Sequence, residues 1–286
     1  MGHKCISVGL QRMSTSRITI CSVVRDCGKN LGQNIKKIEK LRNLFFDSEV
    51  VIFENDSKDQ TANILKKWAN SSKNIFIKSE NFNTSTIPIK TSGVNPYFSM
   101  FRIEKMSFYR NQYLEVINSN NFKRDYVLII DLDISDFSIK GIAHSFGVPN
   151  DWSCITANGT SLSKRLKRQY HDAYALIEQG CVNHIQSEEI IENNRLKFSF
   201  LKYGMPLFPV ASAFGGLAIY NWDSIKGKYY SCMPNENSKV QVLCEHVSLH
   251  SQLGGNVFIN PSMKVKYRVV DLPFLLKYIK DGNLIK

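Results

Sequence analysis

The sequence predicts an α/β fold with a mainly parallel central sheet flanked by helices, because apolar β-prone runs alternate with segments of helical periodicity. A first strand is expected from Ile18 to Val24, followed by apolar residues at helical spacing between Leu31 and Phe45. A strand from Glu49 to Glu54 and a helix through Ala62 to Ala69 repeat that order. Parallel strands need such crossover helices, so the repeat favours a parallel sheet over a meander.

The pattern continues with a third short strand from Asn74 to Lys78 and a loop rich in Ser, Thr, Asn and Pro from Asn81 to Pro96. Residues Phe98 to Asn118 carry apolar side chains on one helical face. The run Tyr126 to Ile130 is apolar throughout, which is typical of a strand that is covered on both faces.

The second half of the chain is less regular. It predicts strands at Ser153 to Ala157, Val210 to Tyr220 and Val257 to Tyr267, and helices at Glu188 to Leu201 and Cys244 to Leu253. No linker separates two domains, so residues 18–286 are expected to form one domain. Residues 1–17 are polar and basic without clear periodicity, which predicts a flexible leader.

Composition is that of an ordinary globular protein, with 286 residues, 43% hydrophobic and 22% charged. The longest apolar runs fall well short of the roughly 20 residues that a membrane span needs, and no secretory signal follows the amino terminus. We therefore expect a cytoplasmic protein. The seven cysteines show no Cys-x-x-Cys spacing, so neither a disulfide framework nor a zinc site is predicted.

The formal net charge of +12 favours anionic partners by long-range attraction. Basic residues concentrate at Lys36–Arg42, Lys164–Arg168 and Lys264–Arg268. These runs lack the interleaved aromatic residues of a nucleic-acid platform, so no nucleic-acid partner is expected. Nucleotide sugars remain as partners, and peripheral contact with an anionic membrane surface stays open.

An acidic pair, Asp131 and Asp133, ends the buried run Tyr126 to Ile130. Residues two apart on an extended chain point to the same side, so both carboxylates can approach one cation. Carboxylate oxygens suit Mg²⁺ or Mn²⁺, which complete their coordination with phosphate oxygens. The pair therefore predicts a metal-diphosphate site.

Polar residues also follow the first two strands, with Arg25 after the first and Glu54 and Asp56 at the end of the second. Ligands in open α/β sheets bind outside the carboxyl ends of the strands, so these side chains are expected to converge on the acidic pair. A turn and helix cap would explain Asp56 and Ser57 equally well.

Several ordered elements together resemble a known family. They are the strand leading to Arg25, Glu54-Asn55-Asp56-Ser57, Arg110-Asn111, Asp131-Leu132-Asp133, His171-Asp172-Ala173-Tyr174-Ala175, Phe214-Gly215-Gly216 and Cys244-Glu245-His246. This set resembles glycosyltransferases of the A-type (GT-A) fold, most closely the fungal capsule (cryptococcal) α-mannosyltransferase family and its bacterial relatives. The resemblance runs from about Ile18 to Tyr267.

The resemblance implies a Rossmann-like GT-A fold, with a nucleotide-sugar-binding half over residues 18–135 and an acceptor-binding half over residues 136–286. It implies metal-dependent transfer of a hexose from a GDP- or UDP-hexose to a hydroxyl of a surface glycan or a lipid-linked glycan. The first expectation is that the donor is GDP-mannose and that the transferred sugar is mannose.

Residue roles follow by matching position. Asp133, with Asp131 beside it, would hold the cation, while Glu54 and Asp56 would face the ribose or base. Arg25 and Arg110 would reach phosphates as forked donors. Surface ion pairs are the alternative for both arginines.

The later motifs leave alternatives open. Gly215 and Gly216 would let the backbone approach the donor sugar, or would form a bulge. Glu245 stands where inverting relatives carry their base, but this chain has Glu-His in place of Glu-Asp, so Glu245 would deprotonate the acceptor, contact it or orient a donor hydroxyl. His246 or His250 would supply a third metal ligand, or both are structural.

Two other function classes compete. A haloacid-dehalogenase-type phosphatase also ends a strand in Asp-x-Asp, with Asp131 as nucleophile and Asp133 as acid, although such enzymes usually place the motif on the first strand. A basic module that binds anions or membranes without catalysis would explain the net charge.

Overall fold

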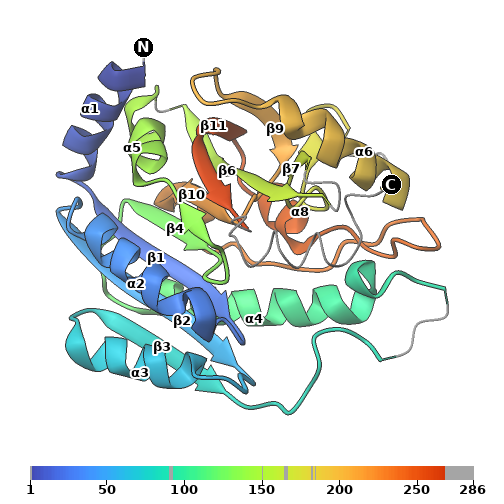
Figure 1. Cartoon of the computed structure of the whole chain (residues 1–286), viewed down its shortest axis with the longest axis horizontal. Helices are drawn as coiled ribbons and strands as arrows, with labels where there is room; N and C mark the ends of the chain where they lie inside the picture. The colour runs from blue at the N-terminus through green and yellow to red at the C-terminus, as the bar shows by residue number, and fades with distance from the viewer. Residues whose placement is uncertain are drawn as a thin grey trace, which may run out of the picture.

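The computed structural model describes residues 2–89, 93–149, 151–163, 167–181, 183 and 185–267, which form one large sheet with helices on both faces (Figure 1). The strands are β1 (Arg17–Val24), β2 (Asp47–Asn55), β3 (Ile75–Glu80), β4 (Tyr126–Ile130), β5 (Asp136–Phe137), β6 (Trp152–Leu162), β7 (Arg168–Tyr170), β8 (Ile177–Glu178), β9 (Phe208–Ser212), β10 (Leu217–Asn221) and β11 (Asn256–Lys266). The α-helices are α1 (Gly2–Met13), α2 (Gly28–Arg42), α3 (Thr61–Ser71), α4 (Met100–Ser119), α5 (Ile139–Gly147), α6 (Glu188–Lys197), α7 (Trp222–Ile225) and α8 (Glu245–His250), and two 3-10 turns are η1 (Pro96–Phe98) and η2 (Phe198–Phe200).

The strand order is β3-β2-β1-β4-β10-β6-β11-β9-β8, with β5 paired to β11 and β7 to β6. Strands β3, β2, β1 and β4 are parallel to their neighbours, and β6 and β11 are parallel to each other. Strand β10 lies antiparallel between β4 and β6, so β6 and β11 run in the same direction as β4. The predicted α/β fold with a mainly parallel, mixed sheet is confirmed.

Strand β4 is covered on both faces, as its apolar sequence predicts. Val127 and Ile129 join one hydrophobic core, and Leu128 and Ile130 join another on the opposite face. Helix α4 packs on the first core through its buried face, and α2 and α3 pack on the second. The acidic pair therefore leaves the sheet from a strand that is buried on both faces.

The amino-terminal segment differs from the expected flexible leader. Residues Gly2–Met13 form α1, which packs against α5, and Met13 is fully buried. A methyl group added at Gly9 would lie 1.7 Å from the carbonyl oxygen of Ala143. One added at Gly147 would lie 1.8 Å from the carbonyl oxygen of Cys5. The two helices can approach this closely because glycine has no side chain. The spacing of hydrophobic residues in the sequence therefore does not predict the contact.

The single strand predicted from Val210 to Tyr220 is also wrong. The segment forms β9, which pairs with β11, and β10, which lies between β4 and β6. Gly215 and Gly216 make the turn between them with φ of 64° and 86°, a backbone region that favours glycine. Apolar residues on both sides conceal the break, since both strands are buried.

Within the described residues, none of the helices has the length and apolar character required to cross a bilayer.

Candidate active site

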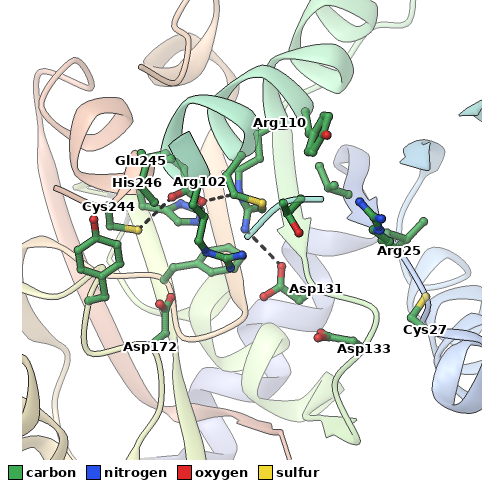
Figure 2. A pocket seen from close by; sticks show the side chains of 18 of the residues that line it. Arg25, Cys27, Arg102, Arg110, Asp131, Asp133, Asp172, Cys244, Glu245 and His246 are labelled. Carbon is green, nitrogen blue, oxygen red and sulfur yellow. Dashed lines mark hydrogen bonds and ion pairs between the residues drawn. The ribbon is translucent and has the colours of Figure 1, made fainter. Parts of the chain in front are cut away.

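A cavity of about 520 Å³ opens where β1, β2 and β4 end, with α4 and the start of α8 forming its far wall. Figure 2 shows the charged side chains around it. Six residues predicted from the sequence line this cavity, namely Arg25, Arg110, Asp131, Asp133, Glu245 and His246. Of the three residues expected to converge on the acidic pair from the first two strands, Arg25 lines this cavity, whereas Glu54 and Asp56 do not.

Asp131 is the more constrained of the two aspartates. Its Oδ2 accepts a hydrogen bond from the Tyr267 hydroxyl at 3.0 Å, and its Oδ1 lies 3.5 Å from Nη2 of Arg110. Burial raises the pKa of Asp131 to about 6, although Arg110 opposes the rise. The backbone N–H of Asp131 donates to the carbonyl of Gly216 at 2.9 Å, which fixes the start of the acidic loop.

Asp133 is the freer carboxylate. Asp133 is exposed at the mouth of the cavity. Among the described residues, no side chain donates a hydrogen bond to its carboxylate. Its backbone carbonyl accepts from Asn30 at 3.0 Å, which anchors the loop to α2. Desolvation at the cavity wall raises the pKa of Asp133. A carboxylate held in place by its backbone but left open is suited to a cation or to a ligand hydroxyl.

Arg110 joins α4 to the acidic pair and to α8. Its Nε donates to Oε1 of Glu245 at 2.9 Å, and its guanidinium lies over the Phe214 ring at 5.1 Å. Burial opposes its charge, but Tyr113, Asp131 and Glu245 more than compensate and raise the pKa of Arg110. Its buried Nη1 has no hydrogen-bond partner in the described part of the chain. The cavity wall thus carries a permanent cation with an unused donor.

The start of α8 supplies Glu245 and His246. Glu245 is buried, with Oε1 paired to Arg110 and Oε2 3.4 Å from the Cys244 thiol. The His246 ring stacks on Phe214 with centroids 3.9 Å apart, and neither ring nitrogen has a hydrogen-bond partner among the described residues. Burial lowers the pKa of His246 well below its usual value, so the ring is neutral.

His250 lies elsewhere, although it follows His246 by one helical turn. Its Nδ1 is 2.9 Å from the Ser212 hydroxyl and its Nε2 is 2.9 Å from the Tyr220 hydroxyl. Burial lowers the pKa of His250 to about 3. The structure does not bring His250 to the cavity, and its two ring nitrogens are engaged in the core.

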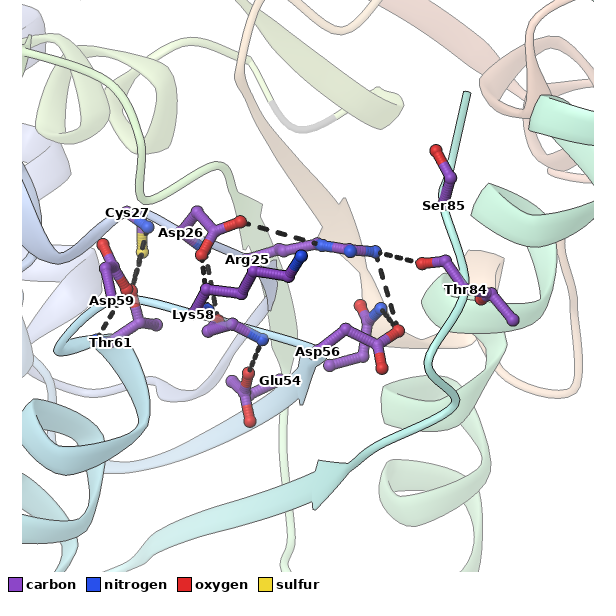
Figure 3. Close-up of polar contacts among 12 residues, drawn as sticks. Arg25, Asp26, Cys27, Glu54, Asp56, Lys58, Asp59, Thr61, Thr84 and Ser85 are labelled. Carbon is purple, nitrogen blue, oxygen red and sulfur yellow. Dashed lines mark hydrogen bonds and ion pairs between the residues drawn. The ribbon is translucent and has the colours of Figure 1, made fainter. Parts of the chain in front are cut away.

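A second hollow of about 390 Å³ shares Arg25 with the first cavity. Nη1 of Arg25 donates to the Thr84 carbonyl at 2.9 Å and lies 3.6 Å from Oδ2 of Asp56 (Figure 3). Burial tends to raise the pKa of Asp56. Hydrogen bonds from the Asn55 side chain and from the Asn83 backbone N–H outweigh this effect and lower the pKa. Asp56 therefore lines the second hollow as a charged group.

Glu54 lies outside both cavities. Its Oε1 accepts from the Ser57 backbone N–H at 3.0 Å, and its Oε2 accepts a hydrogen bond from the Ser79 hydroxyl. The side chain is buried, and these two hydrogen bonds fix the loop after β2.

Gly215 and Gly216 also stay behind the cavity wall. A methyl group at Gly215 would lie 2.3 Å from the Ala157 carbonyl oxygen, and one at Gly216 would lie 2.4 Å from the Tyr267 hydroxyl. The protein's own packing accounts for both glycines.

The residues that line the cavity without a role assigned from the sequence include His171, Asp172 and Tyr267. Asp172 has a φ of 63°, unusual for a residue other than glycine, and burial with nearby Asp131 and Glu245 raises its pKa to about 8. The His171 ring stacks on Tyr267 with centroids 3.4 Å apart. The motif His171-Asp172 was the available signal for two of them, whereas Tyr267 ends a strand without any local signature.

The chain matches no family model, and no curated protein matches its sequence. Among solved structures it is similar to the mannosyltransferase PcManGT from Pyrobaculum calidifontis in complex with GDP-Man and Mn²⁺, with 11% identity over 96% of this chain and 66% of that chain and a TM-score of 0.47. It is also similar to S. aureus TarS 1-349 in complex with UDP-GlcNAc, with 11% identity over 89% of this chain and 60% of that chain and a TM-score of 0.44. A mycobacterial protein matches with 12% identity, 98% and 77% coverage and a TM-score of 0.43.

The chain thus spans about three fifths to two thirds of the length of the first two of these structures.

Proposed function

We propose that this protein is a metal-dependent glycosyltransferase of the GT-A fold. It would move a hexose from a nucleotide diphosphate sugar to a hydroxyl of a glycan or a lipid-linked glycan. The observation that carries the proposal is the exit of Asp131 and Asp133 from central strand β4 into a cavity that also holds the cations Arg25 and Arg110. Paired carboxylates beside phosphate-binding donors suit a diphosphate that arrives with a divalent ion.

The residues present fit Mg²⁺ or Mn²⁺. Such ions often bind through one or two carboxylates and take their remaining ligands from water and substrate phosphates. Asp133 offers the open carboxylate, and Asp131 stands beside it with Oδ2 held by Tyr267. No cluster of three or more His, Cys, Asp or Glu side chains with metal-site geometry occurs in the described ranges, so a substrate would have to complete the coordination. When bound, the ion would neutralise the diphosphate and the charge that develops on the leaving group.

Arg110 would bind the diphosphate directly. It is fixed by Glu245 on one side and Asp131 on the other, and its Nη1 is the unused donor. A guanidinium that is fixed before the ligand arrives stabilises developing negative charge without reorganisation. The nucleoside would extend past Arg25 toward the second hollow, where Asp56 stands.

Glu245 would position Arg110 and is a poor candidate for the acceptor's general base, because its Oε1 is already engaged in a buried ion pair. His246 is neutral and has unpaired ring nitrogens, so it would contact an acceptor or donor hydroxyl.

The test is a thermal-shift and turnover screen of GDP-mannose, GDP, UDP-hexoses and UDP, each with and without Mn²⁺. We expect Mn²⁺-dependent stabilisation by one nucleoside diphosphate and slow release of that nucleotide from its sugar donor. Asp133→Asn should abolish the Mn²⁺-dependent part of this stabilisation. It should leave the melting temperature of the free protein within a few degrees of that of the unmodified protein. Asp223→Asn, a change on the exposed surface of α7, is the matched control. Equal metal-dependent shifts in both variants would count against the proposal.

The phosphatase alternative requires Asp131 as a nucleophile. In this structure one oxygen of Asp131 accepts a hydrogen bond and the other faces a guanidinium, and the motif follows the fourth strand of the chain. Trapping of a hydroxylamine-sensitive phosphoenzyme would favour it over the transferase.

A further inference from the structure

A separate hollow of about 380 Å³ lies between β5, the start of α5 and the end of β11, outside the cavity described above. Among the described residues, four lysines line it, Lys37, Lys140, Lys264 and Lys266, together with one acidic residue, Asp136. Two of these lysines belong to the basic run at the end of the described chain, which the proposed reaction does not use.

The charges of this basic hollow do not balance. The ammonium of Lys37 contacts the Asp136 carboxylate and the Phe137 carbonyl, so these two charges satisfy each other. In the described part of the chain, Lys140, Lys264 and Lys266 have no carboxylate within ion-pair distance. Three cations therefore face one depression without a counter-charge.

Burial, together with repulsion from Arg168 and Lys266, lowers the pKa of Lys264. Lys264 is half-buried, and its ammonium lies 5.8 Å from the centroid of the Tyr203 ring. Lys264 and Lys266 are thus held close enough for each charge to disfavour the other, and an anion in the hollow would relieve that repulsion.

The backbone around the hollow adds to its positive potential. Helix α5 begins at its edge, has no acidic residue in its first turn, and directs the positive end of its dipole toward the hollow. The N–H of Ser138 donates to the Lys264 carbonyl at 2.9 Å, and the N–H of Ser135 donates to the Lys266 carbonyl at 2.8 Å. These bonds fix the strand that carries two of the lysines relative to the helix start.

We propose that this basic hollow binds a phosphate group, carried either by a soluble phosphate compound or by a phospholipid headgroup. Lys140, Lys264 and Lys266 supply the charge-assisted hydrogen bonds, and the first turn of α5 supplies backbone dipole. The site does not depend on the transferase reaction, because none of its residues lines the catalytic cavity.

The experiment uses the full chain at constant ionic strength in two arms. Inorganic phosphate is titrated by calorimetry, with chloride as the reference anion. Vesicles of phosphatidylglycerol in phosphatidylcholine are sedimented with the protein, with pure phosphatidylcholine as the reference. The variant Lys140→Gln/Lys264→Gln/Lys266→Gln should bind at least about tenfold more weakly to the probe that resembles the natural ligand, either inorganic phosphate or phosphatidylglycerol vesicles.

The matched control removes the same charge elsewhere, as Lys67→Gln/Lys123→Gln/Lys226→Gln, at three exposed positions. It should change binding by less than about twofold. Selective loss in the phosphate arm identifies a soluble ligand, and selective loss in the vesicle arm identifies a headgroup. Equal loss in both triple variants, or no binding of the unmodified protein to either probe, would overturn the proposal. If the half-buried Lys264 change unfolds the chain, Lys140→Gln/Lys266→Gln at two exposed sites replaces it.

Discussion

Arg110 and Glu245 form a buried ion pair between α4 and α8, with Nε and Oε1 2.9 Å apart and 135 positions of chain between them. Both side chains are almost fully shielded from solvent, at 7% and 6% exposure. The pair fixes the guanidinium beside Asp131 and connects the two halves of the molecule at the cavity.

Glu245→Gln should therefore destabilise the protein. Removing one charge of a buried pair leaves the other poorly compensated, and we expect the free energy of unfolding to fall by about 2–4 kcal/mol, measured by urea denaturation. Glu236→Gln at an exposed position should change it by less than about 0.5 kcal/mol. Similar small effects of both changes would show that Asp131 alone can compensate Arg110.

Tyr267→Phe should move the pH dependence of the proposed metal-assisted nucleotide binding. Burial raises the pKa of Asp131 to about 6, and the Tyr267 hydroxyl opposes this rise by donating to the carboxylate. Without that hydroxyl Asp131 keeps its proton to a higher pH, so the midpoint of Mn²⁺-dependent stabilisation should shift upward. Thermal shifts between pH 5 and pH 8 measure the midpoint, and Tyr229→Phe at an exposed site should leave it unchanged.

Asp172→Asn should reduce the loss of stability that accompanies a rise in pH from 3.8 to about 8. The pKa of Asp172 is raised to about 8 by burial and by Asp131 and Glu245, from an ordinary value of 3.8. The folded protein then binds more protons than the unfolded chain between these values, so its stability falls as the pH rises through that window. Asparagine mimics the protonated acid and tolerates the positive φ of this position.

We expect Asp172→Asn to raise the melting temperature relative to the unmodified protein at pH 8 more than at pH 5. The shift in Asp131 leaves some pH dependence in both proteins. A difference between the two proteins that stays constant with pH would contradict this account of Asp172.

Gly9→Ala should separate α1 from α5. Its new methyl group would lie 1.7 Å from the Ala143 carbonyl oxygen, so the helices must shift apart, at about 1–3 kcal/mol of unfolding free energy. Gly32→Ala in α2 meets no atom within 4 Å and should stabilise the protein by about 0.5–1 kcal/mol through helix propensity. Opposite signs for two identical substitutions, measured by urea denaturation, are the expected result. The same sign at both positions would mean that α1 does not pack as closely as described.

The amino-terminal half was predictable because its signals are local. Strand and helix periods alternate clearly from Ile18 to Ile130, and parallel strands bring their carboxyl ends to one edge without further information. That reasoning brought Arg25, Asp131 and Asp133 to one cavity. It failed for Glu54, because the sequence does not reveal that the loop after β2 turns back and takes this carboxylate as its own hydrogen-bond acceptor.

Long-range contacts account for the remaining differences. The pairing of Arg110 with Glu245, the position of Tyr267 above Asp131 and the engagement of His250 by Ser212 and Tyr220 each join segments far apart in sequence. The spacing of four residues predicts that His246 and His250 lie on the same face of a helix. It does not predict which of them faces the cavity, because that depends on packing.

The hydrogen bond from the Asp131 N–H to the Gly216 carbonyl also bears on binding thermodynamics. It couples the backbone of the acidic loop to β10, a strand held between two others, so the backbone at Asp131 is fixed before any ligand arrives. Each mobile side chain that becomes ordered on association costs about 0.5–1.5 kcal/mol of binding free energy. Because Arg110 and Tyr267 already hold the Asp131 side chain, a ligand that bound it would avoid this cost for that residue.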